Sequence, residues 1–232
     1  AAALVVAAAG GAVAKHGNRS VSSQAGSADV LEAAGAALSL GPKEVERCLD
    51  STGFAFLFAP VFHPAMANVA PVRKALGVRT LFNILGPLVN PARTPYALIG
   101  AFSKDMAKLM ADTLAGMEIE RAFVVHGEPG WDEATPCGRF VLYDVRPGQV
   151  DKRVRDPANY RLERCQPEDL AGGDAADNAA ALRKVFSGDL GPHYDALALN
   201  AALLLELTGS ASGRRSSLAH VREAINAGRA LR

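Results

Sequence analysis

Short apolar runs alternate with segments of helical hydrophobic periodicity along most of the chain. Apolar runs of this length, bounded by Gly, Pro or polar residues, are typical of strands buried in a sheet. The predicted strands cover residues 11–14, 54–58, 96–102, 122–125 and 140–145. Two prolines argue against a regular helix or central strand at 59–66, and residues 146–167 are predicted to be irregular surface.

The helical segments have apolar residues three and four positions apart, with capping residues at several ends. In the helix predicted after Ser103, this spacing places Leu109, Met110 and Leu114 on the inward face. The segment 195–207 is rich in alanine and leucine and is apolar on nearly all sides, which predicts a buried helix. The predicted helices cover residues 1–11, 27–34, 43–51, 67–76, 104–117, 175–186, 195–207 and 216–228.

Alternation of strands and helices predicts an α/β fold with a mostly parallel central sheet flanked by helices. The sequence contains no internal repeat, low-complexity linker or second domain boundary, so residues 1–232 are interpreted as one domain.

Composition narrows the classes of function. Of the 232 residues, 49% are hydrophobic and 21% are charged, which is typical of a soluble globular protein. The formal net charge of +1, without a basic run, argues against a nucleic-acid or membrane partner. Cys48, Cys137 and Cys165 lack metal-ligand spacing, and their odd number argues against a full disulfide framework, so a cytoplasmic location is expected.

The stretch from Lys15 to Asp29 carries most of the candidate chemistry. It contains two cations, an imidazole, two side-chain amides, glycines and hydroxyls between a predicted strand and a predicted helix. Backbone N–H groups of such a loop bind anions readily, and arginine binds carboxylates or phosphates through two hydrogen bonds. The same residue types also make ordinary turns, so composition alone leaves both interpretations open.

The string KHGNRSVSSQAGSAD in this stretch resembles the signature loop of the anthranilate phosphoribosyltransferase family of tryptophan biosynthesis. The resemblance implies that Asn18 and His16 bind anthranilate beside 5-phosphoribosyl 1-pyrophosphate. It also implies donor contacts, direct or through the loop backbone, from Lys15, Asn18, Arg19, Ser20, Ser22 and Ser23.

Two later stretches extend the resemblance. Residues 63–77 are similar to the family segment whose arginine binds the anthranilate carboxylate, which implies that role for Arg73; the alternative is a solvated helix arginine. Pro60, His63 and Met66 are implied to line the access path to the same pocket. Residues 79–91, RTLFNILGPLVNP, match another family stretch, to which we assign a structural role in the pocket wall.

Asp132 and Glu133 are the candidate metal ligands. Adjacent carboxylates after a strand are often a solvated loop, but the context VVHGEPGWDE resembles the acidic pair of the family. The resemblance implies Mg²⁺, because departing pyrophosphate needs charge neutralisation and Mg²⁺ is commonly held by carboxylates together with substrate phosphates. The family usually has Leu or Met where this chain has Trp131, and we expect this change to be tolerated.

The implied reaction is displacement of pyrophosphate from ribose C1 by the anthranilate amine. We assign no strong general base, and name His16 only as a weak one. Two other functions stay open: a pyrimidine nucleoside phosphorylase, which shares a KHGN-like loop, and a catalytically silent relative that binds nucleic acid. Residues 63–91 favour the transferase, and the near-neutral charge argues against nucleic acid.

The resemblance covers this chain but not the whole family protein, which has an N-terminal helical domain and a GTGGD phosphate loop that are not found in this sequence. The chain is therefore interpreted as starting inside a domain and is expected to be inactive, or nearly so, on its own. A homodimer is implied for the intact family protein.

Overall fold

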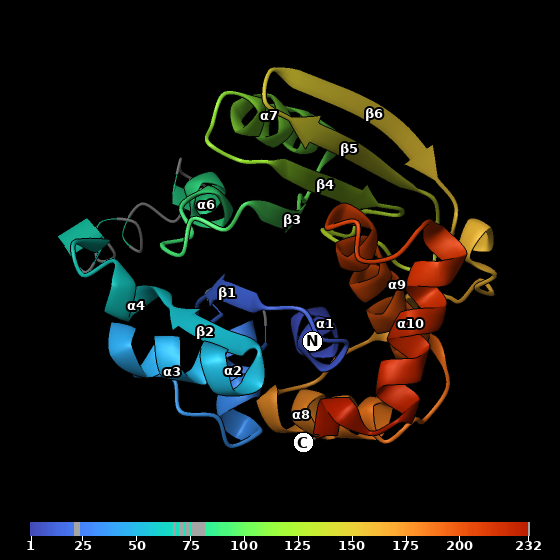
Figure 1. Cartoon of the computed structure of the whole chain (residues 1–232), viewed down its shortest axis with the longest axis horizontal. Helices are drawn as coiled ribbons and strands as arrows, with labels where there is room; N and C mark the ends of the chain where they lie inside the picture. Colours follow the sequence, from blue (N-terminus) through green and yellow to red (C-terminus); the bar gives the residue numbers. More distant parts are fainter. Residues whose placement is uncertain (21–23, 67, 70–71, 73–74, 76–81, 232) are drawn as a thin grey trace. The chain divides into compact units, whose positions relative to one another are not determined.

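The computed structural model describes the chain except for residues 21–23, 67, 70–71, 73–74, 76–81 and 232. The described chain divides into two compact units (Figure 1). The first unit comprises Ala1–Gly11, Thr94–Ala171 and Leu182–Arg232, and the second comprises Ala12–Arg93 and Gly172–Ala181. That residues 1–232 act as one catalytic domain stays a prediction.

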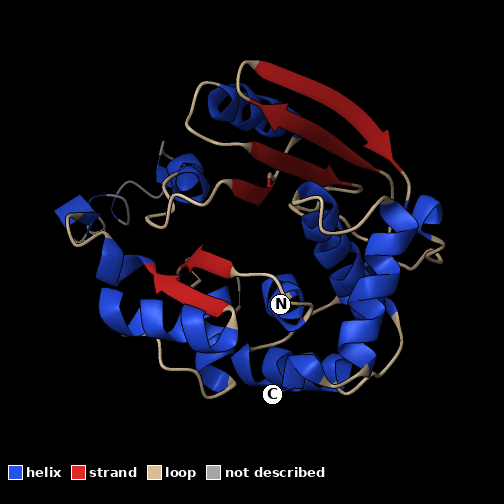
Figure 2. Cartoon of the chain, in the orientation of Figure 1, coloured by secondary structure: helices blue, strands red, loops and turns tan. Residues whose placement is uncertain are grey.

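The first unit contains a four-stranded sheet in the order β3-β4-β5-β6 (Figure 2). Strands β3 and β4 are parallel, whereas β4–β5 and β5–β6 are antiparallel. Parallel neighbours need a crossover, which helix α7 supplies, and antiparallel neighbours need only a short turn. Gly148, at φ 70°, lies in the turn between β5 and β6 and has the left-handed conformation that favours glycine. The strands are β3 (Tyr96–Gly100), β4 (Arg121–Gly127), β5 (Phe140–Arg146) and β6 (Gln149–Arg155).

Helix α7 (Lys104–Ala115) packs against β4 and β5. Its N-terminus is capped as the sequence predicts, since the Ser103 hydroxyl accepts a hydrogen bond from the Met106 N–H at 3.2 Å. Met110 and Leu114 are buried, but the prediction for Leu109 is wrong because 51% of this residue is exposed. Leu109 lies about 100° around the helix from Met110, which turns it away from the sheet.

Helix α9 (Pro192–Leu207) is the central helix of this unit and packs against β3, β4, α1 (Ala2–Ala8) and α10 (Arg214–Asn226). Ten of its residues are buried, which confirms the prediction made from its uniformly apolar sequence. Val5 and Val6 are the buried residues of α1. The short helices of this unit are η2 (Pro157–Tyr160), η3 (Pro167–Leu170) and η4 (Arg229–Leu231).

The second unit is built on a parallel strand pair, β1 (Val13–Gly17) and β2 (Phe54–Phe58). Helix α3 (Pro42–Thr52) packs against β2, and its Val45 joins Ala55 and Leu57 in the core. Gly53, at φ 71°, ends α3 in the left-handed conformation and leads directly into β2. The other helices are α2 (Ser27–Ala33), α4 (Ala59–Phe62), α6 (Phe82–Leu85) and η1 (Gly86–Leu88), and α8 (Ala175–Phe186) spans the division between the units.

The α/β class is confirmed, and parallel pairing is present at β1–β2 and β3–β4. Two sequence predictions are wrong in detail. The segment 146–167 contains β6, whose charged residues obscure the strand pattern because much of this edge strand is exposed. The segment 59–66 begins with the single turn α4, which tolerates Pro60 because first-turn N–H groups need no helical acceptor.

Among the described residues, no helix combines the length and apolar character needed to cross a membrane.

Candidate functional site

The first residues of the signature stretch lie on strand β1, which extends to Gly17 rather than ending at residue 14 as predicted. Pairing with β2 causes the extension, since Lys15, His16 and Gly17 stand opposite Phe56, Leu57 and Phe58. Gly17 allows close packing, because a Cβ there would meet both the Phe56 ring and the Ser27 hydroxyl at 2.8 Å. Lys15 and His16 are therefore held on a strand rather than on a loop.

His16 and His63 form an imidazole pair in the second unit. Their ring centroids are 5.0 Å apart and the ring planes meet at 72°. His16 Nδ1 lies 3.1 Å from the Gly86 carbonyl oxygen. The Nε2 atoms of both histidines are buried and have no hydrogen-bond partner among the described residues. Two unsatisfied buried nitrogens side by side mark a place where a polar ligand group would be stabilised.

Burial lowers the pKa of His16 below its usual 6.5, assisted by the nearby His63 and Lys15, while the Gly86 carbonyl opposes the shift. His16 is therefore neutral at pH 7. Because a carbonyl only accepts hydrogen bonds, Nδ1 carries the hydrogen and Nε2 presents a lone pair. That lone pair is suited to a ligand N–H or O–H donor.

Residues 79–91 contact β1 where the structure describes them. Besides the Gly86 carbonyl on His16, the Asn90 side-chain amide donates to the Ala14 carbonyl at 3.0 Å. These contacts fix β1 and the His16 ring, in keeping with the structural role assigned to this stretch. Residues 79–81 lie outside the described part of the chain.

Arg19 is bound by acidic residues within the loop. Its guanidinium donates to both Glu32 carboxylate oxygens, at 2.6 and 2.9 Å, and to Asp29 at 3.1 Å. These hydrogen bonds raise the pKa of Arg19 and lower the pKa of Glu32. The guanidinium carbon also lies 5.7 Å from the centre of the Phe58 ring. Arg19 thus organises the loop around α2, so a phosphate contact through the loop backbone fits this arrangement better than a direct one.

Asp29 closes the loop onto the start of α2. Its carboxylate accepts hydrogen bonds from the N–H groups of Ser20, at 3.0 Å, and Gly26, at 2.8 Å, and these bonds lower its pKa. Those two N–H groups are therefore occupied by a protein carboxylate. Asn18 is exposed, and its side-chain oxygen accepts from the Arg19 N–H at 2.8 Å. Ser22 and Ser23 lie outside the described residues.

The remaining candidates of this unit follow β2. Pro60 is exposed at the first turn of α4, and Met66 is half-buried three residues after His63. The Met66 N–H donates to the His63 carbonyl at 2.9 Å, which ties the two positions together. Arg73 lies outside the described residues.

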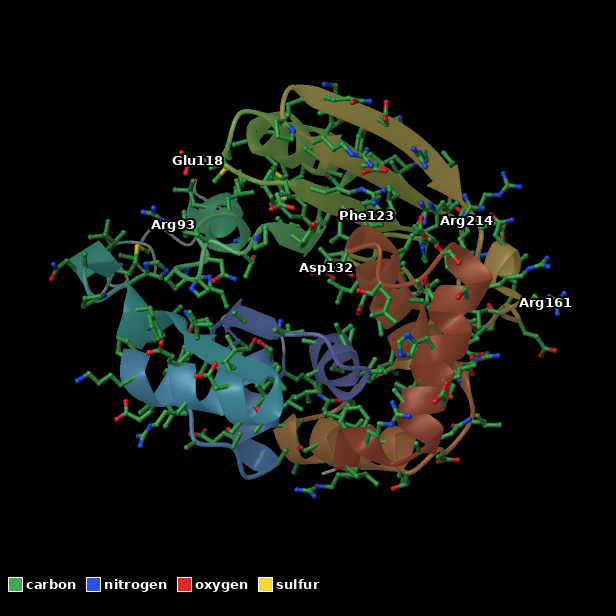
Figure 3. All side chains as sticks on the ribbon, viewed as in Figure 1. Arg93, Glu118, Phe123, Asp132, Arg161 and Arg214 are labelled. Atoms are coloured by element: carbon green, nitrogen blue, oxygen red, sulfur yellow. The ribbon has the colours of Figure 1, made fainter. Side chains whose placement is uncertain are left out.

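The acidic pair lies in the first unit, on the loop that follows β4, where Figure 3 labels Asp132. Two strand-terminal glycines permit this placement. A Cβ on Gly100 at the end of β3 would overlap the Asp132 carbonyl oxygen, and one on Gly127 would overlap that of Glu133. Sequence reasoning missed both glycines, although a glycine at a strand end is a recognised signal of close backbone approach.

Asn200 on α9 also holds this loop, and it too was missed. Its buried side-chain amide accepts from the Ala134 N–H at 3.3 Å and donates to the Ala134 carbonyl at 2.7 Å. Ala134 is fully buried, whereas Asp132 and Glu133 beside it are exposed. The backbone after the acidic pair is therefore fixed while the carboxylates face solvent.

The acidic pair fits a magnesium ion shared with substrate. Exposed carboxylate oxygens are the ligands that Mg²⁺ prefers, and this ion usually combines one or two of them with phosphates and water. Elsewhere in the described chain, no group of three or more His, Cys, Asp or Glu side chains is arranged to hold a metal by itself.

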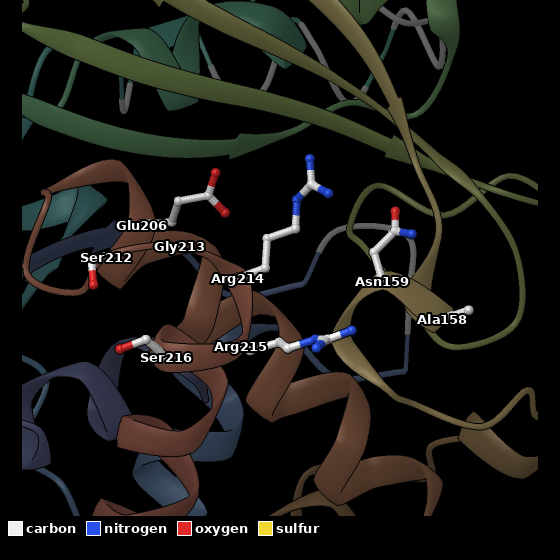
Figure 4. Close-up of a pocket in the computed structure, with 8 residues that line it drawn as sticks. All are labelled: Ala158, Asn159, Glu206, Ser212, Gly213, Arg214, Arg215 and Ser216. Atoms are coloured by element: carbon white, nitrogen blue, oxygen red, sulfur yellow. The ribbon is translucent and has the colours of Figure 1, made fainter.

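An open surface pocket of about 670 Å³ lies at the N-terminus of α10 (Figure 4). None of the candidate residues predicted from the sequence lines it. Glu206 in its wall is already bound to Arg155 at 2.6 and 2.8 Å. The lining residues are Ala158, Asn159, Glu206, Ser212, Gly213, Arg214, Arg215 and Ser216.

Comparison with known proteins supplies the family. Residues 1–231 match the family model described as "Glycosyl transferase family, a/b domain". The chain is 47% identical over 229 residues to the anthranilate phosphoribosyltransferase of Desulforudis audaxviator, covering 99% of this chain and 66% of that protein. It thus spans about two thirds of the length of the curated relatives it matches.

Solved structures of the same family are also similar to this chain. The crystal structure of anthranilate phosphoribosyltransferase from Thermus thermophilus matches with a TM-score of 0.91 and 45% identity, covering 99% of this chain and 68% of that one. The Saccharomyces cerevisiae enzyme in complex with PRPP and Mg matches with a TM-score of 0.90 and 28% identity, covering 99% and 65%. From its sequence, its fold and these relatives, the chain belongs to the anthranilate phosphoribosyltransferase family of glycosyl transferases.

Proposed function

We propose that the protein transfers the phosphoribosyl group of 5-phosphoribosyl 1-pyrophosphate to anthranilate, releasing pyrophosphate, as a step of tryptophan biosynthesis. Family membership supports the reaction class. The observation that carries the proposal to this chain is the His16–His63 pair, with two buried nitrogens that have no partner among the described residues.

Anthranilate has a flat ring, an amine and a carboxylate, and the candidate residues suit each part. The His16 Nε2 lone pair would accept a hydrogen bond from the amine, and the support is that Gly86 engages Nδ1 while Nε2 has no partner among the described residues. Asn18, from the exposed loop, supplies an amide for a second hydrogen bond. Arg73 is proposed to bind the carboxylate, with Pro60, His63 and Met66 along the access path.

The phosphoribosyl donor is proposed to bind along the signature stretch. Lys15 adds a positive charge in the middle of β1, and Arg19 fixes the loop through Asp29 and Glu32. The other proposed donor contacts are Asn18, Ser20, Ser22 and Ser23. Asp132 and Glu133 would hold Mg²⁺, which would neutralise charge on the departing pyrophosphate.

The chemistry needs positioning more than proton transfer. An aromatic amine is neutral at pH 7 and attacks ribose C1 directly as the C1–pyrophosphate oxygen bond breaks, through a state resembling an oxocarbenium ion. A neutral His16 can accept an amine hydrogen bond and so orient the nitrogen lone pair toward C1. This role is consistent with at most a weakly basic His16.

Two measurements test the proposal. Anthranilate and donor binding to this chain are measured by fluorescence and calorimetric titration with Mg²⁺, and turnover of the protein from its whole reading frame is followed by loss of anthranilate fluorescence. We expect binding of both ligands and turnover that requires donor and Mg²⁺. Binding of a pyrimidine nucleoside or single-stranded DNA in place of anthranilate would overturn the proposal.

We further propose that the protein acts in the cytoplasm as a homodimer. The support is the family resemblance together with cysteines that are free in the structure. Light scattering of the whole-frame protein at several concentrations tests the dimer, and a single-chain mass at all of them would contradict it.

A further inference from the structure

Two of the three cysteines lie side by side in the first unit. The sulfur atoms of Cys137 and Cys165 are 3.6 Å apart although 28 positions separate them in the sequence. Both residues are half-buried, and neither belongs to the proposed substrate sites. Their spacing in the sequence does not predict this contact.

A shared ion pair holds the segments that carry the two thiols. The Asp156 carboxylate accepts from Arg139 at 3.3 Å and from Arg164 at 2.8 Å, and these arginines lie two residues after Cys137 and immediately before Cys165. Asp156 is itself fixed, because it also accepts from the Ala158 N–H at 2.9 Å at the start of η2. The two segments are therefore also linked by contacts outside the thiols themselves.

The segment that carries Cys137 is also bound to helix α9. Ala134, three residues earlier, is bound through both backbone polar groups by Asn200 of α9. A disulfide bond is about 2.05 Å long, so the sulfurs must approach by roughly 1.5 Å, within reach of side-chain rotation. We propose that Cys137 and Cys165 are a dithiol pair that closes into a reversible disulfide on exposure to a peroxide.

The reaction balances with hydrogen peroxide as oxidant. The Cys137 sulfur attacks one peroxide oxygen, an S–O bond forms as the O–O bond breaks, and the departing oxygen leaves as water with the Cys137 proton. The Cys165 sulfur then attacks Cys137, the S–S bond forms as the S–O bond breaks, and the hydroxyl leaves as water with the Cys165 proton. Two thiols and one peroxide thus give one disulfide and two waters, and a small dithiol reverses the change by exchange.

The environment of Cys165 is consistent with its role in the second step, the attack on oxidised Cys137. Burial and the hydrogen bond to Cys137 raise the pKa of Cys165 to about 12, with added effects from Asp169 and Asp195. Cys165 therefore stays protonated at neutral pH, which suits a thiol that reacts second, since the thiolate is the reactive form. Cys137 lies four residues after Glu133, so the disulfide would restrain the loop that carries the acidic pair.

Thiol counting and peptide mapping test the proposal on the whole chain, treated with a modest excess of hydrogen peroxide and then denatured. We expect three free thiols to fall to one, with a single linked peptide pair containing Cys137 and Cys165, and dithiothreitol to restore all three. The oxidised chain should unfold at a temperature higher by roughly 5–10 °C.

Single substitutions provide the controls. Cys48→Ser should form the same link and retain no free thiol, whereas Cys137→Ser and Cys165→Ser should form no link within the chain and show no peroxide-dependent rise in unfolding temperature. If either of these fails to fold by circular dichroism, the wild type and Cys48→Ser still decide the question. Three persistent thiols, over-oxidised Cys137 without a link, or links only between chains would overturn the proposal.

Discussion

The side chain of Asn200 binds both backbone polar groups of Ala134, accepting from its N–H at 3.3 Å and donating to its carbonyl at 2.7 Å. The same amide donates to the Ala196 carbonyl at 2.9 Å, one turn earlier in α9. One buried amide therefore joins the central helix to the loop that carries Asp132 and Glu133. The position of the acidic pair depends on a helix about 65 residues further along the chain.

Replacing Asn200 by Leu keeps the approximate volume but removes these hydrogen bonds. Because Ala134 is fully buried, its N–H and carbonyl would lose their partners, and we expect a loss of about 1–3 kcal/mol in the free energy of unfolding. Urea denaturation measures the loss. The matched control is Asn159→Leu, an exposed amide with one 3.3 Å bond to the Asp156 N–H, for which we expect a smaller loss; equal losses would contradict the argument.

Arg155 supplies a test of buried charge. Only 1% of its side chain is exposed, and it pairs with both carboxylate oxygens of Glu206 at 2.6 and 2.8 Å. Glu206→Leu leaves this cation buried without its carboxylate, with the Tyr160 hydroxyl and the Phe123 ring as its remaining neighbours among the described residues, and should reduce stability by on the order of 3 kcal/mol. In the exposed Lys108–Asp112 pair, Asp112→Leu should have a much smaller effect on stability, because solvent screens this pair. Similar urea midpoints for the two variants would refute this contrast.

The acidic pair should act in donor binding rather than in folding. Because Asp132 and Glu133 are exposed, Asp132→Asn with Glu133→Gln should leave the free energy of unfolding within about 0.5 kcal/mol of the wild-type value. Calorimetric titration should show weaker Mg²⁺-dependent binding of 5-phosphoribosyl 1-pyrophosphate. The double variant Glu46→Gln with Asp50→Asn, on exposed positions of α3, removes the same charge and should bind as wild type does. Unchanged affinity in the first variant would remove the metal assignment.

His16 should make the second unit sensitive to mild acid. Its folded-state pKa is lowered below 6.5 by burial, so between these two values the unfolded chain binds more protons than the folded one. Its contribution to stability is therefore present above pH 6.5 and is lost as the pH falls through 6.5 toward the folded-state pKa. Proton NMR of the imidazole, assigned by comparison with His16→Gln, measures the titration. A midpoint at or above 6.5 would show that the ring is not held neutral by burial.

Arg73 should discriminate between the two substrates. If it binds the anthranilate carboxylate, Arg73→Ala removes a charged contact of about 1.5–3 kcal/mol, which corresponds to a rise of roughly tenfold or more in the KM for anthranilate. Both constants are measured in the intact protein, and the KM for the phosphoribosyl donor should change far less. Arg93→Ala is the matched control on an exposed arginine and should alter neither constant strongly. Equal effects of Arg73→Ala on both substrates would argue against the assignment.

The class of the fold and most of its elements could be predicted from local patterns of residues. Local sequence signals predicted helix α8 (Ala175–Phe186) with its correct bounds, and they predicted Ser103 as the N-cap of α7. The uniformly apolar sequence of α9 predicted its burial, because a helix without a polar face can only be stable inside the protein. The signature stretch and the acidic pair were likewise recognisable as continuous strings of residues.

Contacts between distant segments could not be predicted in this way. Strand β6 and the extension of β1 depend on a pairing partner, and edge strands with charged residues lack a clear hydrophobic alternation. Arg19 pairs with Glu32, His16 stands beside His63, Asn200 binds Ala134, and Cys137 meets Cys165, all across 13 to 66 positions of sequence. Hydrogen bonds and ring contacts act over a few ångströms in space, so only the folded backbone determines which side chains come close enough to form them.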